Sequence, residues 1–86
     1  MPEICRFFGI VITMNHSDHV PPHFHVRYQS SRASIAITSL TMLKGRLPPR
    51  VLGLTLEWAV RHRTELLENW ERARKHSRLF RIEPLQ

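Results

Sequence analysis

Three histidines and one aspartate that could bind a metal ion lie close together within residues 18–25. His23 and His25 are two residues apart, so in a β-strand both side chains project from the same face, about 6 to 7 Å apart at the backbone. Two imidazoles at this spacing can bind one ion, and Asp18 and His19 could reach the same ion from the preceding loop. Such a donor set suits zinc, nickel, manganese or iron. The alternative is that both histidines lie on a half-solvated sheet face while Asp18 and His19 cap a turn.

The same histidines could do chemistry without a metal. Because histidine titrates near neutral pH, one imidazole could take the 2′-hydroxyl proton of RNA while a second, protonated imidazole serves the leaving oxygen. Arg27 is predicted on the same face and could offset the charge that develops on the phosphate. The sequence therefore allows a metal-dependent or histidine-dependent hydrolase or ribonuclease, with His23, His25 and Arg27 as candidate catalytic residues. It does not decide whether the protein is an enzyme.

The charge balance allows a different kind of function. The 86 residues include 13 Lys and Arg against 7 Asp and Glu, which gives a formal net charge of +6. A basic surface attracts polyanions, so nucleic acid and an acidic partner protein are both allowed, although the excess could serve solubility alone. Seven cations near the ends of a predicted helical region are candidates for nucleic-acid or anion binding: Arg46, Arg50, Arg72, Arg74, Lys75, Arg78 and Arg81.

Alternating hydrophobic residues predict the strands that position the histidines. Residues 4–14 are predicted as one strand with one buried face, and residues 23–29 and 32–38 as two strands joined across Ser30-Ser31. The predicted register pairs Phe24 with Ile37 and puts the histidines on the opposite face, since a shift of one residue would bury them. A short strand near residues 42–44, ended by Gly45, is expected to follow.

A helical region follows the strands. It opens at Pro48-Pro49 and extends over residues 51–75, as one long bent helix or as two helices with a break around residues 61–63. Its predicted core-facing stripe consists of Leu52, Leu56, Ala59, Leu66, Leu67, Trp70 and Ala73. Residues 79–85 are predicted as a C-terminal edge strand that stops at Pro84. The predicted fold is a single α+β domain over residues 1–86: a small antiparallel sheet with the helical region packed on one face.

Composition excludes several classes of protein. One cysteine, Cys5, leaves no internal disulfide framework and no cysteine-based zinc site, and is typical of a reducing compartment. No apolar run approaches the ~20 residues needed to span a bilayer, and the first residues lack a basic signal-peptide start. We therefore expect a cytoplasmic protein without membrane contact. An edge strand and a small core are compatible with a homodimer.

The chain resembles the domain of unknown function 4160 family of short prokaryotic proteins. The resemblance rests on residues 7–12 (FFGIVI), 18–26 (DHVPPHFHV), 45–48 (GRLP), 57–58 (EW), 62–63 (HR), 65–67 (ELL), 69–70 (NW) and 82–85 (IEPL). Members are often encoded beside a second small domain, that of unknown function 2442, in a layout similar to toxin–antitoxin or paired regulatory modules. The resemblance implies a bacterial interaction or regulatory module that acts with a partner protein. This chain departs from the family at Arg27, Arg32, Ala36 and Lys44, where relatives carry acidic residues.

Overall fold

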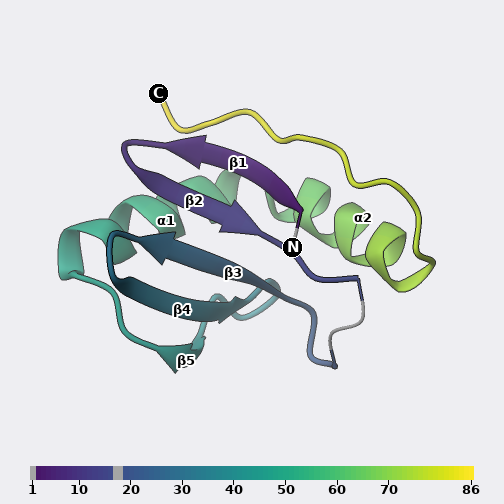
Figure 1. Ribbon diagram of the computed structural model, residues 1–86, viewed down its shortest axis with the longest axis horizontal. Helices are drawn as coiled ribbons and strands as arrows, with labels where there is room; N and C mark the ends of the chain where they lie inside the picture. Colours follow the sequence, from purple (N-terminus) through teal and green to yellow (C-terminus); the bar gives the residue numbers. More distant parts are fainter. Residues whose placement is uncertain (1, 17–18) are drawn as a thin grey trace.

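The protein folds as a five-stranded antiparallel sheet and two helices (Figure 1). The structure, a computed structural model, describes residues 2–16 and 19–86. The elements, in chain order, are β1 (Glu3–Phe7), β2 (Ile10–Thr13), β3 (His23–Tyr28), β4 (Ser31–Ala36), β5 (Met42–Gly45), α1 (Pro49–Arg61) and α2 (Arg63–Arg74). Each strand pairs with the next along the chain, so the order in the sheet is β1-β2-β3-β4-β5. The predicted α+β fold is confirmed.

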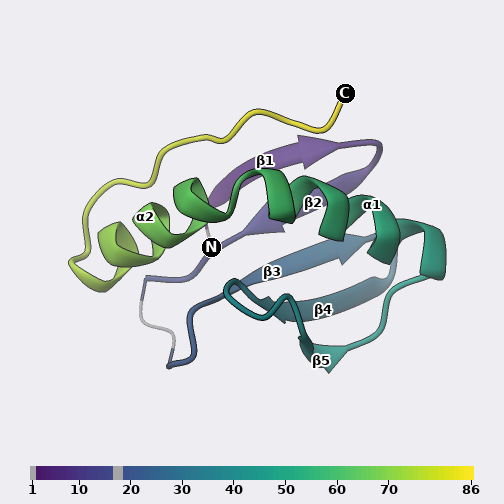
Figure 2. The same ribbon diagram turned by 180° about the vertical axis from the view of Figure 1, so that it is seen from behind.

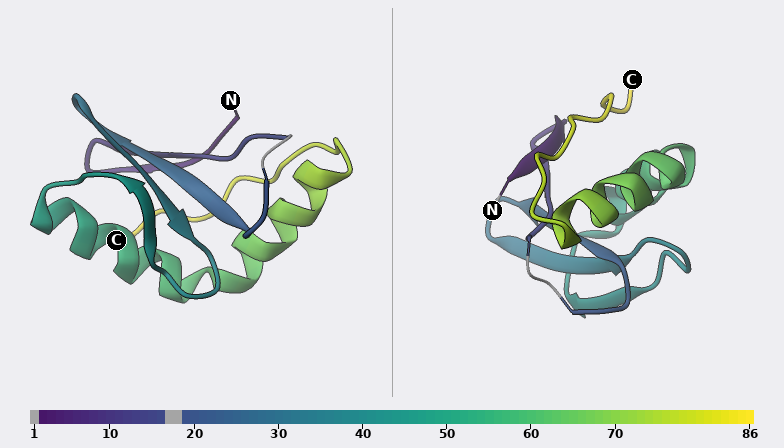
Figure 3. Two further views of the ribbon diagram at one scale, coloured as in Figure 1. Left: turned by 90° about the horizontal axis from the view of Figure 1, so that it is seen from below. Right: turned by 90° about the vertical axis from the view of Figure 1, so that its right-hand side faces the viewer.

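Both helices pack on the same face of the sheet. They lie behind the sheet in Figure 1 and in front of it in Figure 2, and Figure 3 shows the two layers from the side. Fully buried apolar side chains fill the space between the layers, among them Phe24, Ile35, Trp58 and Leu66. None of the described residues forms a helix on the opposite face of the sheet, and we name it the open face.

The prediction of a single strand over residues 4–14 is wrong, because the structure has a hairpin there. Phe8 and Gly9 form the turn with φ angles of 50° and 80°, and β1 pairs with β2 across it. Positive φ at both central residues is typical of tight hairpin turns, which glycine favours. Phe8, predicted on the buried face, lies on this turn and is 58% exposed.

The second hairpin has the predicted faces but a different register. His25 pairs with Ser34 and Phe24 with Ile35, two positions away from the prediction, because the turn lies at Gln29-Ser30. Gln29 adopts a φ of 52° there. A shift of two residues keeps every side chain on its predicted face, since the strand repeat is two.

The helical region breaks at His62, within the predicted interval, into two helices. In α1 the predicted stripe holds at Ala59, which is buried, but Leu52 and Leu56 are only half-buried. The other buried positions of α1 are Val51, Thr55 and Trp58. Within the described part of the chain, neither helix is long and apolar enough to cross a membrane.

The predicted C-terminal edge strand is absent, since the structure assigns no strand to residues 79–85. This segment runs beside β1 in an irregular conformation, with a backbone hydrogen bond of 2.8 Å from Ile82 N to Ile4 O (Figures 1 and 3). Side chains of the helices hold it instead: Trp58 Nε1 donates to the carbonyl of Glu83, and Asn69 bonds both backbone groups of Phe80. Alternation in the sequence does not distinguish this arrangement from a paired strand.

Candidate functional site on the open sheet face

The two central histidines lie on the open face, as predicted. His23 and His25 are half-buried on β3, and their ring centroids are 5.1 Å apart in an edge-on arrangement. The Nδ1–H group of His23 donates to the carbonyl of Pro21 at 2.8 Å, and its ring lies 5.3 Å from that of Trp70. These contacts fix the imidazole of His23 at the end of the sheet where β3 begins.

His25 is held between two polar side chains. The amide Nδ2 of Asn15 lies 3.4 Å from its Nε2, and the hydroxyl of Ser34 lies 3.4 Å from its Nδ1. Which partner donates in each of these two contacts depends on the tautomer of His25.

The metal site predicted for Asp18, His19, His23 and His25 is not formed by the described residues alone. Among residues 2–16 and 19–86, no group of three or more His, Cys, Asp or Glu side chains could hold a metal ion. Asp18 lies outside the described residues, so the metal site stays a prediction. The catalytic roles predicted for His23, His25 and Arg27 stay predictions as well.

Two adjoining pockets hollow the open face. The first, of about 210 Å³, is lined by Thr13, His25, Val26, Arg27, Arg32, Ala33, Ser34, Lys44 and Gly45, and we name it the basic pocket. The second, of about 360 Å³, is lined by His19, Val20, Pro21, His23, His25, Ser34, Leu43 and Lys44, and we name it the apolar pocket. His25, Ser34 and Lys44 line both, so the two pockets form one groove across β3, β4 and β5.

The stretch of chain that contains β3, β4 and β5 carries most of the net charge of the protein. Residues 19–56 contain five Lys and Arg residues and no Asp or Glu, so five of the six units of formal net charge belong to this stretch. The described glutamates lie on β1, on the helices and on the C-terminal segment. In the described part of the chain no carboxylate forms an ion pair with Arg27, Arg32 or Lys44. An anion in the groove would therefore meet unneutralised cations.

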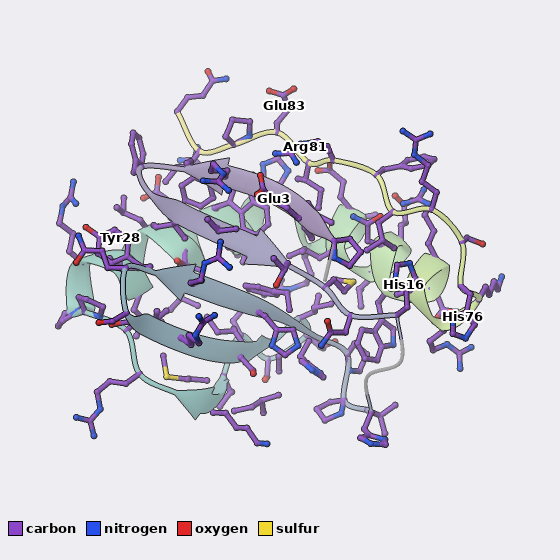
Figure 4. All side chains as sticks on the ribbon, viewed as in Figure 1. Glu3, His16, Tyr28, His76, Arg81 and Glu83 are labelled. Atoms are coloured by element: carbon purple, nitrogen blue, oxygen red, sulfur yellow. The ribbon has the colours of Figure 1, made fainter. Side chains whose placement is uncertain are left out.

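The cations predicted at the end of α2 have mostly structural contacts. The guanidinium of Arg72 lies 3.7 Å from the centre of the Phe80 ring and donates to Asn69 Oδ1. Arg74 forms an ion pair with Glu71, and Arg81 forms one with Glu3, which Figure 4 shows beside it. Lys75 and Arg78 are exposed.

Arg46 and Arg50, predicted at the start of the helix, are also exposed. The backbone N–H of Arg46 donates to the carbonyl of Arg32, which fixes β5 beside β4. Arg50 lies in the first turn of α1, which contains no acidic residue. Neither side chain lines the groove.

Sequence reasoning did not identify Arg32, Ser34 and Lys44 as parts of a site. The information was present in two signals: the carboxylate-free stretch over residues 19–56, and the alternation that puts Arg32 and Ser34 on the face of Arg27 and His25. The position of Lys44 depends on the pairing of β5, which is irregular between Ser34 and Ile35.

The fold and the groove define a small α+β domain that presents an open, basic sheet face. The chain belongs to the family described as Domain of unknown function (DUF4160), whose model matches residues 9–71. The matched stretch contains β2 to β5, α1 and most of α2. All the residues that line the two pockets lie within it. No curated protein and no solved structure matches the chain.

Proposed function

We propose that this protein is a small interaction module whose open-face groove binds an acidic segment of a partner protein. The observation that carries the proposal is the combination of exposed apolar side chains with cations that no carboxylate of the described residues pairs with. Val20 is 78% exposed and Leu43 is 42% exposed, and both line the apolar pocket beside Lys44. Protein interfaces commonly join an apolar centre to a charged rim, and opposite charges on the partner add specificity and speed association.

A nucleic acid fits this groove less well. Proteins that bind single strands stack the bases on aromatic side chains. The exposed aromatic rings of Phe8 and Phe80 lie on the β1–β2 turn and on the C-terminal segment, and neither lines the groove. The aromatic rings in its lining are histidine imidazoles, which are smaller stacking surfaces than Phe, Tyr or Trp rings. A phosphate backbone would also leave Val20 and Leu43 without an apolar partner.

The resemblance to the domain of unknown function 4160 family suggests the partner, because members are often encoded beside a second small domain. We expect a small protein encoded nearby, with the domain of unknown function 2442 as the first candidate, in a pair of the toxin–antitoxin or regulatory type. The expected setting is the bacterial cytoplasm, which suits the single thiol. Burial raises the pKa of Cys5 to about 11, so this thiol is unreactive at neutral pH.

The test is a selection of random peptides displayed on phage against the immobilised full-length chain. We expect selected peptides to combine Asp or Glu with at least one large apolar residue, and to bind the double variant Arg27→Gln/Arg32→Gln about tenfold more weakly or worse. Val20→Ser/Leu43→Ser should also weaken binding, because it removes the apolar wall. The matched control, Lys75→Gln/Arg78→Gln, makes the same change of charge outside the groove and should bind normally.

Two results would overturn the proposal. The first is a set of selected peptides without net negative charge, or with equal affinity for the groove variants and the control. The second is binding of labelled single-stranded RNA that Arg27→Gln/Arg32→Gln abolishes and Val20→Ser/Leu43→Ser does not affect, since that pattern indicates a nucleic-acid surface. Cleavage of the RNA that His23→Ala and His25→Ala abolish would establish the histidine-dependent enzyme instead.

A further inference from the structure

We propose that the basic pocket binds a phosphate monoester group, carried by a phosphorylated side chain of the partner segment. That a partner segment carries the phosphoryl group rests on the proposed function. The affinity of the basic pocket for a phosphoryl group rests on the residues that line the pocket. The argument concerns three cations from three adjacent strands: Arg27 of β3, Arg32 of β4 and Lys44 of β5.

Strand pairing brings these cations together. Arg27 and Arg32 are direct partners across β3 and β4, and Lys44 is the direct partner of Ser34, two positions from Arg32 on the same face. Like charges at paired positions destabilise a sheet, and no described carboxylate offsets them. Binding of an anion would remove this repulsion, so the site favours a ligand that neutralises more than one cation.

The backbone of β5 allows the close approach of Lys44. Gly45 has a φ of +84°, and a Cβ at this position would lie 2.0 Å from the carbonyl oxygen of Arg32. Only glycine therefore fits where β5 turns against β4. Gly45 and Arg32 both line the basic pocket, together with Lys44 and Arg27.

The donors of the pocket suit a phosphoryl group better than a carboxylate. A phosphate monoester carries a charge of about −1.5 to −2 at pH 7 and three acceptor oxygens, whereas a carboxylate has one charge and two oxygens. Guanidinium groups bind phosphate with paired N–H donors, and an ammonium adds a point charge. The hydroxyl of Ser34, which lies at the junction of the two pockets, can donate a further hydrogen bond to a phosphoryl oxygen.

The shape of the groove indicates that a peptide carries the phosphoryl group. His25, Ser34 and Lys44 line both pockets, so one extended peptide can place a phosphoryl group in the basic pocket and an apolar side chain against Val20 and Leu43. A base could stack on an imidazole ring of the apolar pocket, but the aliphatic side chains of Val20 and Leu43 favour an apolar side chain of a peptide there.

The test uses nuclear magnetic resonance titrations of the full chain labelled with ¹⁵N. The probes are N-acetyl-O-phosphoserine amide, N-acetyl-glutamate amide, inorganic phosphate and adenosine monophosphate, at about pH 7.5, where the phosphate monoesters are dianions because their second pKa is near 6. An ionic strength of about 0.1 M, held constant, limits the range of unspecific attraction to about 10 Å. We expect saturable shifts of the Ser34, Lys44 and Gly45 amides, and at least about tenfold tighter binding of the phosphoserine probe than of the glutamate probe.

Variants locate the site and separate the two proposals. Arg27→Gln, Arg32→Gln and Lys44→Gln should each weaken phosphoserine binding at least about fivefold, whereas Lys75→Gln/Arg78→Gln should leave it unchanged. Val20→Ser/Leu43→Ser should weaken binding of the selected peptides and leave phosphoserine binding intact. Failure of the natural protein to bind acidic peptides, together with intact phosphoserine binding, would refute the proposed function alone. Equal affinity for phosphoserine and glutamate probes, or shifts spread over the helices, would overturn the phosphate site. Tighter binding of adenosine monophosphate than of phosphoserine would overturn the peptide carrier.

Discussion

Arg27 lies directly opposite Arg32 in the antiparallel pair of β3 and β4, on the face of the sheet that no helix covers. This arrangement is unfavourable for the free protein, because like charges at paired positions repel. In binding proteins, a locally unfavourable cluster of one charge is often the part that meets the ligand. The pair therefore links the stability of the sheet to the proposed function of the groove.

Replacing one arginine of this pair should stabilise the protein. We expect Arg27→Thr to raise the free energy of unfolding by about 0.2–1 kcal/mol, because it removes the repulsion and introduces a residue that favours strands. Urea unfolding at low and high salt measures the effect. The gain should shrink at high salt, where charges are screened. A loss of stability, or a gain that salt does not change, would show that the two guanidinium groups do not repel each other.

The carboxyl of Glu3 should make stability depend on acid pH. Hydrogen bonds from Arg6 and then from Arg81 lower its pKa from 4.5 to about 2. A carboxyl whose pKa is lower in the folded than in the unfolded state stabilises the protein above the unfolded value. We therefore expect the contribution of Glu3 to be complete above about pH 5 and to be lost as the pH falls from 4.5 towards 2.

The variant Glu3→Gln tests this dependence. The stability difference between the natural protein and the variant, measured by urea unfolding, should be largest near neutral pH and should narrow through the acid range. Glu83→Gln is the matched control on the neighbouring C-terminal segment, and no ion pair of its side chain is present among the described residues. A difference for Glu3→Gln that stays constant down to pH 2 would contradict the lowered pKa.

Asn69 should be essential for holding the C-terminal segment. This buried side chain donates to the Phe80 carbonyl at 2.8 Å and accepts from the Phe80 N–H at 2.9 Å. Asn69→Ala would leave both backbone groups of Phe80 without these partners, so we expect a loss of about 3 kcal/mol in the free energy of unfolding. Amide exchange near Ile82 should accelerate in parallel, whereas Glu68→Ala, an exposed neighbour, should change stability by less than about 0.5 kcal/mol. Equal effects of the two substitutions would show that the segment is held by other contacts.

Periodicity in the sequence was sufficient to predict the faces of β3 and β4, although not those of the first hairpin. His25 and Arg27 lie on the open face although the predicted register was wrong by two positions, because burial of Phe24 and Val26 fixes only the parity of the strand. The break between the helices was also predictable, since a single long helix would extend beyond the core of so small a domain. These features depend on local sequence and on size.

Contacts between a side chain and a distant backbone were not predictable. The C-terminal segment has the alternation of a strand, yet Asn69 and Trp58 bind its backbone groups from the helices. The first hairpin depends on Phe8-Gly9, a weak turn signal inside a continuous apolar pattern. The groove itself was missed because Lys44 reaches it only through the irregular pairing of β5 with β4.

Substitution by alanine should change the stability of the protein in opposite directions at Gly53 and at Gly45. Gly53 lies in α1 with no atom within 4 Å of the position of a Cβ, so Gly53→Ala should stabilise the protein by about 0.5–1 kcal/mol. Gly45→Ala should destabilise it by more than this gain, because its Cβ would collide with the Arg32 carbonyl at a positive φ. Thermal unfolding of both variants gives the comparison. Stabilisation by Gly45→Ala would show that β5 does not approach β4 as closely as the structure indicates.

Trp70 should contribute to the core and to the site at the same time. Its side chain is 3% exposed on α2, and its ring lies 5.3 Å from the ring of His23 at the start of β3. Truncation of a buried aromatic residue leaves a cavity, so we expect Trp70→Ala to lower the free energy of unfolding by about 3 kcal/mol or more. The adjacent exposed residue supplies the control, since Glu71→Ala should cost less than about 0.5 kcal/mol. Urea unfolding measures both, and a loss below about 0.5 kcal/mol for Trp70→Ala would place this ring on the surface, where it could contact a partner directly.

The milder Trp70→Phe keeps an aromatic ring against His23, so a shift of the His23 resonances larger in Trp70→Ala than in Trp70→Phe would show that the core orients this imidazole of the groove.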